Sequence, residues 1–162
     1  MALQEMKLEE KGQNVDDLVY TLKNGNINAV LEAAMQLGKM GGKAVGPLMP
    51  LLKNENDIVR VRAAIAFQRI GAPAAPYLIK WIEDDEYEAK GAAIWALGHI
   101  GGNNAVEPLM RKLGATHSWT RWASIAALIR LGDPKGVSAA REAMKHEDED
   151  AQGIIEELIA RS

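Results

Sequence analysis

The sequence contains no cysteine and only one phenylalanine, and it has no apolar run of the about 18 residues that a membrane span needs. Without cysteine, the chain has no disulfide, no thiol nucleophile and no thiolate ligand for a metal. Residues 1–12 mix acids with lysines and lack an apolar core, so a signal peptide is not expected. These absences predict a cytoplasmic protein without a membrane segment.

An excess of positive charge is also missing. The formal net charge is −3 over 162 residues, which argues against nucleic acid as a partner. Hydrophobic residues make up 48% and charged residues 25% of the chain, as is ordinary for one soluble domain. Aromatic residues are scarce at 5%, yet four of them are tryptophan, so the tryptophans are the first residues to place.

A repeat of about 30 residues runs through the chain. Each unit has an alanine-rich segment that ends in an apolar residue and a glycine, followed by a second apolar segment. The closing glycines are 30 or 31 residues apart: Gly41, Gly71, Gly101 and Gly132. We therefore expect an all-α fold, a right-handed α-α superhelix (a solenoid) of about four helix pairs with half-units at both ends.

The predicted domain organisation follows from this register. A polar tail covers residues 1–12, and a single repeat domain covers 13–162. Its units are 13–24 (half), 25–54, 55–84, 85–115, 116–147 and 148–162 (half).

Several residues mark expected helix ends. Asp57, Asp84 or Asp85, and Ser118 stand where a first helix needs an N-cap, because their side-chain oxygens accept free backbone N–H groups. Pro50 lies deeper than the first turn of its second helix, so we expect a distortion or a later helix start there.

The units resemble the HEAT repeat family, in the short variety called PBS-lyase HEAT-like repeats, whose units carry Asp, Val-Arg, Ala-Ala, Ala-Leu-Gly and Ile-Gly. The matching residues are Asp57, Val59-Arg60, Ala63-Ala64, Ala66-Phe67, Ile70-Gly71, Ala92-Ala93, Ala96-Leu97-Gly98 and Ile100-Gly101, with Ala105 to Leu109 for Ala-Val-Glu-Pro-Leu. The resemblance covers residues 13–162. It implies that first helices form the outer, convex layer and that second helices line the concave side.

The residues do not favour catalysis. Some relatives attach bilin pigments, and others hold iron with His-Glu pairs, so a bilin-lyase-type (phycobiliprotein lyase-like) subunit is one alternative that the resemblance implies. His99, His117 and His146 fall in different repeat positions, and only His146 precedes a glutamate. The serines carry no motif that pairs them with a base. We expect a protein that is not an enzyme, with no catalytic residue, metal or cofactor.

Basic residues recur at two repeat positions. Arg60, Lys90 and Arg121 form one column, and Lys39, Arg69, His99 and Arg130 form another. In the simplest interpretation, these basic side chains lie on a solvent-exposed edge of the solenoid and pair with acids such as Asp57. A phosphate-binding ridge is the sharper hypothesis, and it gives the second alternative, a nucleic-acid-binding protein that uses a basic ladder.

One apolar stripe breaks the expected pattern. At 100° per residue, the face of the first helices opposite the core should be polar, but apart from Asn28 and Glu88 it is apolar. The stripe consists of Leu31, Met35, Ile58, Val61, Ile65, Trp95, Trp119 and Trp122. It is expected to be a convex surface for a partner or for self-association, with a homodimer as the simplest assembly. Neighbouring repeats or residues 1–12 could instead cover it.

The second helices supply another candidate surface. The predicted concave groove consists of Tyr20, Tyr77, Lys80, Trp81, Arg111 and Lys112. Tyr77 and Trp81 are four residues apart on one face and, beside basic side chains, could hold an acidic or apolar peptide. Alternatively, Trp81 caps the core between repeats. Together these patterns predict a protein-interaction scaffold or adaptor that binds a protein or a peptide.

Overall fold

The computed structural model describes residues 13–84 and 90–161, and within them all regular elements are helical. The α-helices are α2 (Val15–Asn24), α3 (Ile27–Met40), α4 (Val45–Leu48), α5 (Asp57–Ile70), α6 (Ala75–Glu83), α7 (Gly91–Ile100), α8 (Val106–Arg111), α9 (Ser118–Leu131), α10 (Pro134–Met144) and α11 (Glu149–Ala160). Short 3-10 turns accompany them: η1 (Gly41–Ala44), η2 (Met49–Lys53), η3 (Ala72–Ala74), η4 (Asn103–Ala105) and η5 (Lys112–Gly114).

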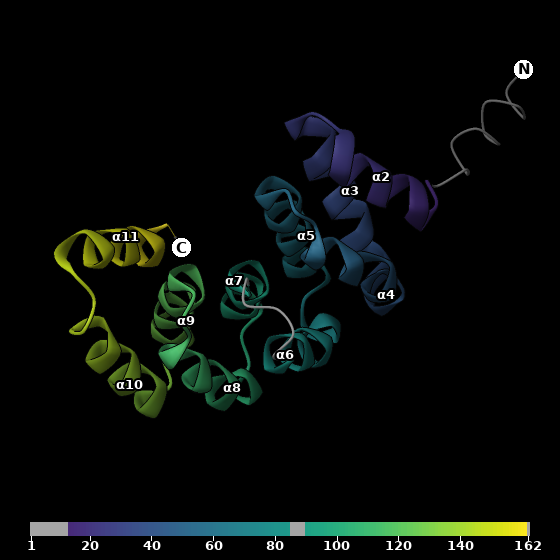
Figure 1. The fold of residues 1–162 in the computed structure, drawn as a ribbon. Helices are drawn as coiled ribbons and strands as arrows, with labels where there is room; N and C mark the ends of the chain where they lie inside the picture. Colours follow the sequence, from purple (N-terminus) through teal and green to yellow (C-terminus); the bar gives the residue numbers. More distant parts are fainter. Residues whose placement is uncertain (1–12, 85–89, 162) are drawn as a thin grey trace, which may run out of the picture.

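The helices stack in two layers (Figure 1). The first-helix layer contains α3, α5, α7, α9 and α11, and the second-helix layer contains α4, α6, α8 and α10. Four helix pairs follow one another, with α2 and α11 as half-units at the two ends. The prediction of an all-α solenoid is therefore confirmed. The predicted tail, residues 1–12, lies outside the described residues.

The helix ends agree with the sequence only in part. Gly71 has φ 76°, a positive φ that glycine adopts without strain, as expected after a first helix. The N-cap predictions are wrong by one residue: Asn56 caps α5 by accepting from the Ile58 N–H, and His117 stands before α9. Asp84 does not cap α7, since it follows α6 and α7 begins at Gly91, and its alternative, Asp85, lies outside the described residues. The distortion expected at Pro50 is confirmed, because α4 ends before it and continues as η2.

One hydrophobic core runs between the two layers, from Leu18 to Ile155. Its members are the apolar positions that recur in each unit, and Phe67 is the bulkiest of the fully buried side chains. Burying such a side chain contributes about 1.5–3 kcal/mol, so the repeated apolar positions stabilise the stack. Within 13–84 and 90–161, no helix has the length and apolar character needed to cross a bilayer.

The curvature of the solenoid is opposite to that implied by the family resemblance. In Figure 1 the first-helix layer is the shorter, inner row, and the second helices fan out along the outer row. Residues of α5, α7, α9 and α11 also line one shared hollow, as helices on a concave side can. The prediction that first helices form the convex layer is therefore wrong: they form the concave side.

Small residues explain this direction of curvature. A Cβ added at Gly38 would lie 2.8 Å from the Arg69 carbonyl oxygen, and one at Gly98 would lie 2.9 Å from the Ala127 Cβ. Glycine and alanine at these contacts bring neighbouring first helices close together, whereas the second helix α6 buries the larger side chains Leu78, Trp81 and Ile82. Axes of packed helices are about 8–10 Å apart depending on those side chains, so the alanine-rich layer is the shorter one.

Candidate functional site

Exposed apolar side chains concentrate on the concave layer. Ile58 is 60% exposed, Val61 49% and Trp119 37%, whereas Ile65, Trp95 and Trp122 are partly buried. Large exposed apolar residues of this layer also include Ile27, Leu31 and Met35 on α3 and Ile154 on α11. We call the surface formed by Leu31, Met35, Ile58, Val61, Ile65, Trp95, Trp119 and Leu158 the inner groove.

Three adjoining hollows of the inner groove meet at Trp119. One, of about 280 Å³, is lined by Asp57, Arg60 and His117 beside Trp119. A second, of about 190 Å³, runs from Val61 past Trp95 to Leu158 and Arg161 of α11. A third, of about 10 Å³, adds His99 and Arg130 to Trp95 and Trp119. Trp119 is therefore the centre of the groove, with a polar end and an apolar end on either side of it.

Gly91 sets the position of the Trp119 indole. A Cβ added at Gly91 would lie 1.9 Å from Trp119 Cδ1 and 2.1 Å from its Nε1. The ring consequently lies directly against Gly91, in the first turn of α7. Gly91 occupies the repeat position that Leu31 and Val61 occupy in the preceding units. Any larger residue at position 91 would push the indole out of this place.

Trp95 lies half-buried one helix away, with its ring near His99 (centroids 4.0 Å apart). His99 Nδ1 is 2.9 Å from the Trp95 carbonyl oxygen. Burial lowers the pKa of His99, and the positive charge of Arg130 lowers it further, against the raising effect of the backbone hydrogen bond. The ring is thus held as a neutral, apolar-facing wall of the groove.

Trp122 serves a different purpose from Trp119. Its Nε1–H donates to Glu147 Oε2 at 2.9 Å, and Arg121 donates to the same carboxylate through Nε at 2.6 Å. The Arg121 hydrogen bond holds the pKa of Glu147 below its ordinary value, and the Trp122 bond adds to the effect against desolvation. These contacts fasten α9 to the turn before α11, so Trp122 joins two units and does not belong to the inner groove.

The first basic column is used inside the fold. The Arg60 guanidinium donates to the carbonyls of Asn54 and Glu55 and pairs with Asp57. Lys90 Nζ donates to the carbonyls of Trp81 and Asp84, and Arg121 donates to those of Ala115 and Thr116. Each cation thus holds the carbonyls at or just beyond the end of the preceding second helix, which leaves little support for a phosphate-binding role of this column.

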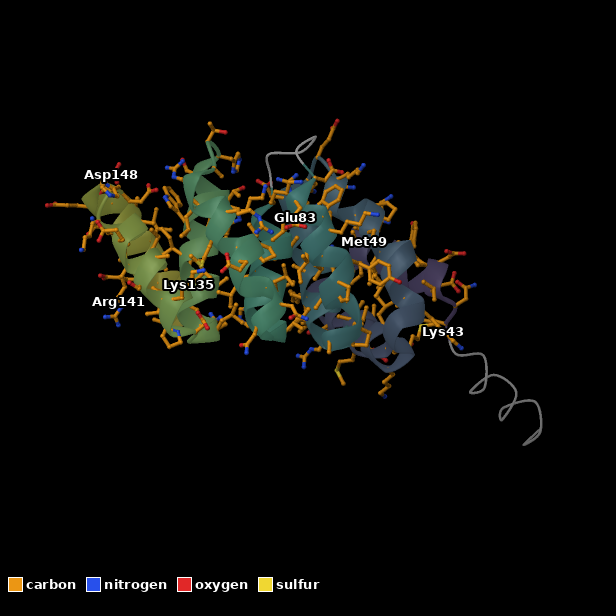
Figure 2. The ribbon with its side chains drawn as sticks, turned by 90° about the horizontal axis from the view of Figure 1, so that it is seen from below. Lys43, Met49, Glu83, Lys135, Arg141 and Asp148 are labelled. Atoms are coloured by element: carbon orange, nitrogen blue, oxygen red, sulfur yellow. The ribbon has the colours of Figure 1, made fainter. Side chains whose placement is uncertain are left out.

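The residues predicted to form a concave groove lie elsewhere. They belong to α2 and to the second-helix layer, which Figure 2 views from outside, with Met49 and Glu83 labelled. Tyr77, Lys80 and Trp81 share an open hollow of about 480 Å³ with those two residues, but Tyr20, Arg111 and Lys112 do not line it. Trp81 is only 7% exposed and belongs to the core, with Lys53 and Lys90 over its ring. This position agrees with the alternative interpretation, in which Trp81 caps the core between repeats.

Ion pairs link neighbouring second helices across the outer face. Arg111 pairs with Glu83, and Lys135 pairs with Glu107. The Glu107 hydrogen bond and charge raise the pKa of Lys135. Among the described residues, no cluster of three or more His, Asp or Glu side chains could hold a metal ion. His117 Nδ1 is buried and has no hydrogen-bond partner among them.

The contribution of α11 to the inner groove was missed from the sequence. Leu158 lines the second and third hollows, and Arg130 donates to its carbonyl at 3.3 Å. The signal that could have revealed it is the pair Ile154 and Leu158, four residues apart and beside the buried Ala151 and Ile155. One apolar stripe of α11 packs on the core, so the second stripe is available to line the inner groove.

Comparison with sequence models of known families identifies the repeat. A sequence model of the family described as HEAT repeats matches residues 15–89 and 75–159. The uncharacterized protein SkfG of Bacillus subtilis (strain 168) is 31% identical over 109 residues, which are 65% of this chain and 63% of SkfG. A designed armadillo repeat protein in complex with the peptide (KR)4 gives a TM-score of 0.47 at 20% identity, covering 96% of this chain and 84% of its own. Because the family matches span nearly the whole described region, the chain belongs to the HEAT repeat family.

Proposed function

We propose that this protein is a scaffold that binds a segment of a partner protein in the inner groove. The observation that carries the proposal is the gathering of exposed apolar side chains on the concave layer, around the three hollows that meet at Trp119. Contiguous exposed apolar surface on a soluble protein usually marks a binding site. The outer layer, by contrast, carries charged side chains and ion pairs (Figure 2).

The dimensions of the hollows favour side chains of a peptide over a small-molecule ligand. The two larger ones measure about 280 and 190 Å³. Sites for small molecules and cofactors usually enclose about 300–1,000 Å³. A hollow bordered by Trp119 and Val61 instead suits an apolar anchor residue, the kind of contact that dominates binding energy in many interfaces.

Shape also bears on self-association. A stable dimer buries about 1,200–2,000 Å² in total, and two concave surfaces placed face to face touch mainly at their rims. A narrow segment can enter the groove, so we propose a different protein as partner, with a homodimer through the same residues as the rival. Light scattering over a range of concentrations separates them, since only the rival predicts a mass that doubles.

Panning a random peptide library against the purified protein tests the proposal. Selected peptides should bind the wild type and lose about tenfold or more in affinity on Val61→Glu and on Trp119→Ala. Val61 is 49% exposed, so the glutamate is not forced into the core. Tyr77→Ala, at a 55% exposed residue of the outer layer, is the matched control and should change nothing. Peptides that bind both inner variants as well as the wild type, or a panning that enriches none, would refute the proposal.

A further inference from the structure

The second basic column borders the inner groove, at the last turns of the first helices. It contains Lys39, Arg69, His99 and Arg130. Lys39 and Arg69 are exposed, and Arg130 is partly buried beside Trp95 and Trp119. The column therefore forms a cationic edge along an apolar floor.

The cations of this edge are not neutralised within the described part of the chain. There, none of Lys39, Arg69 and Arg130 forms an ion pair. Arg130 instead donates to the neutral carbonyl of Leu158. The contrast with Arg121 is direct: the Glu147 carboxylate raises the pKa of Arg121, whereas desolvation lowers the pKa of Arg130.

The helix dipoles offset only part of the positive charge on these side chains. A helix C-terminus carries about −0.5 of an elementary charge, which favours a cation in the last turn. The full positive charges of Lys39 on α3, Arg69 on α5 and Arg130 on α9 therefore leave an excess along the edge, to which the neutral His99 of α7 adds nothing. The adjoining floor is lined mainly by apolar side chains such as Val61 and Leu158, which suit apolar side chains of a partner better than a phosphate backbone.

We propose that the segment bound in the inner groove is an acidic amphipathic helix, with apolar side chains on the Trp95–Trp119 floor and carboxylates along the edge formed by Lys39, Arg69 and Arg130. The inference rests on the proposed function and names the chemistry of its partner. Charge complementarity across the groove would select this partner over neutral or basic segments.

The spacing of the edge indicates a helical partner. Neighbouring first helices lie about 8–10 Å apart, so Lys39 and Arg69 are separated by about that interval, and Arg69 and Arg130, with the neutral His99 between them, by about twice that interval. In an α-helix, residues seven apart share a face and are about 10.5 Å apart. In an extended strand, same-face residues are about 6.6 or 13 Å apart, and neither distance fits. An acidic residue at every seventh position, over about 20 residues, would follow the whole edge.

Fluorescence anisotropy with three labelled probes tests the inference. The probes are a synthetic amphipathic helix of about 20 residues with leucines on one face and glutamate at each edge position, the same peptide with lysine for every glutamate, and oligo(dT) of about 20 nucleotides. Lys39→Glu with Arg69→Glu reverses the edge. Lys43→Glu with Arg141→Glu, at exposed outer residues labelled in Figure 2, is the matched control. The neutral variant Lys39→Gln with Arg69→Gln removes the two charges without reversing them, so it still tests the edge if the reversed variant misfolds.

We expect the glutamate peptide to bind the wild type more tightly than the lysine peptide does. Edge reversal should weaken glutamate-peptide binding about tenfold, the neutral pair less, and the control pair not at all. Equal binding of the two peptides, or an unchanged affinity after reversal, would overturn the inference. Tighter binding of oligo(dT) that is lost on reversal would also overturn it, since the edge would then serve nucleic acid.

The same probes separate this inference from the proposed function. If Val61→Glu abolishes binding of both peptides while edge reversal affects neither, the groove binds a partner and only the charge inference fails. If Val61→Glu leaves the binding of both peptides unchanged, the proposed function itself fails.

Discussion

Gly98 is the position at which the packing of the concave layer is most open to measurement. It lies in α7, and a Cβ added there would be 2.9 Å from the Ala127 Cβ and 3.0 Å from the Ala127 Cα. Contacts this short are essentially absent between real side chains, and the obstacle is backbone that cannot rotate away. Gly98→Ala should therefore force α7 and α9 apart.

The magnitude follows from two opposing effects. Alanine in a helix interior is more stable than glycine by about 0.5–1 kcal/mol. Adding a methyl group to a tightly packed contact costs about 1–3 kcal/mol. The second effect exceeds the first, so Gly98→Ala should lower the free energy of unfolding by about 1 kcal/mol. In a protein of this size that corresponds to about 2–4 °C in Tm.

Gly153→Ala is the control for this measurement. Gly153 lies within α11, where an added Cβ would meet no atom within 4 Å. The same chemical change should raise stability there by about 0.5–1 kcal/mol, because only the helix propensity acts. Thermal and urea unfolding followed by far-UV circular dichroism give both values. If Gly98→Ala stabilises the protein as much as Gly153→Ala, first helices are not closely packed and our explanation of the curvature is wrong.

Three further predictions concern the contacts between units. Glu147→Gln removes the charged acceptor shared by Arg121 and Trp122 and should cost about 1–3 kcal/mol of unfolding free energy in urea, whereas Glu142→Gln, at an exposed pair, should change nothing measurable. Because the folded-state pKa of Glu147 is lowered, its stabilisation is full above the ordinary pKa of about 4.3 and disappears as pH falls through the folded value. The Tm of the wild type should therefore drop more between pH 5 and about pH 3 than that of Glu147→Gln, and equal drops would contradict this assignment. Arg111→Ala should change the free energy of unfolding by less than about 1 kcal/mol, since its pair with Glu83 is exposed; a larger loss would mean that outer ion pairs hold the solenoid together.

The repeat and its core could be predicted from the sequence because they depend on local rules. Gly71 was recognised as the end of a first helix from the repeat, and only glycine adopts its positive φ without strain. Pro50 was expected to disturb its helix because it cannot donate a backbone hydrogen bond, and the 3-10 turn there bears this out.

The candidate site was less predictable because its residues are distinguished by long-range contacts. Trp119 and Trp122 lie on one face of α9 by periodicity, but Trp122 reaches Glu147, 25 residues further on. The Trp119 indole lies against α7 because Gly91 leaves room for it. Helical periodicity cannot separate these two environments, since each depends on the unit next to it.

The direction of curvature, by contrast, was present in the sequence and was overlooked. The family resemblance decided which layer was called convex, although the first helices are the alanine-rich ones. Small residues shorten the distance between helices, so the layer that contains them must become the inner row of a curved stack. The bulky Val61, Trp95 and Trp119 on that row then face one another across a concave surface. The residues that close the contacts beneath the groove, Gly98 above all, therefore also set its width, and a change there should be felt in the groove as well as in stability.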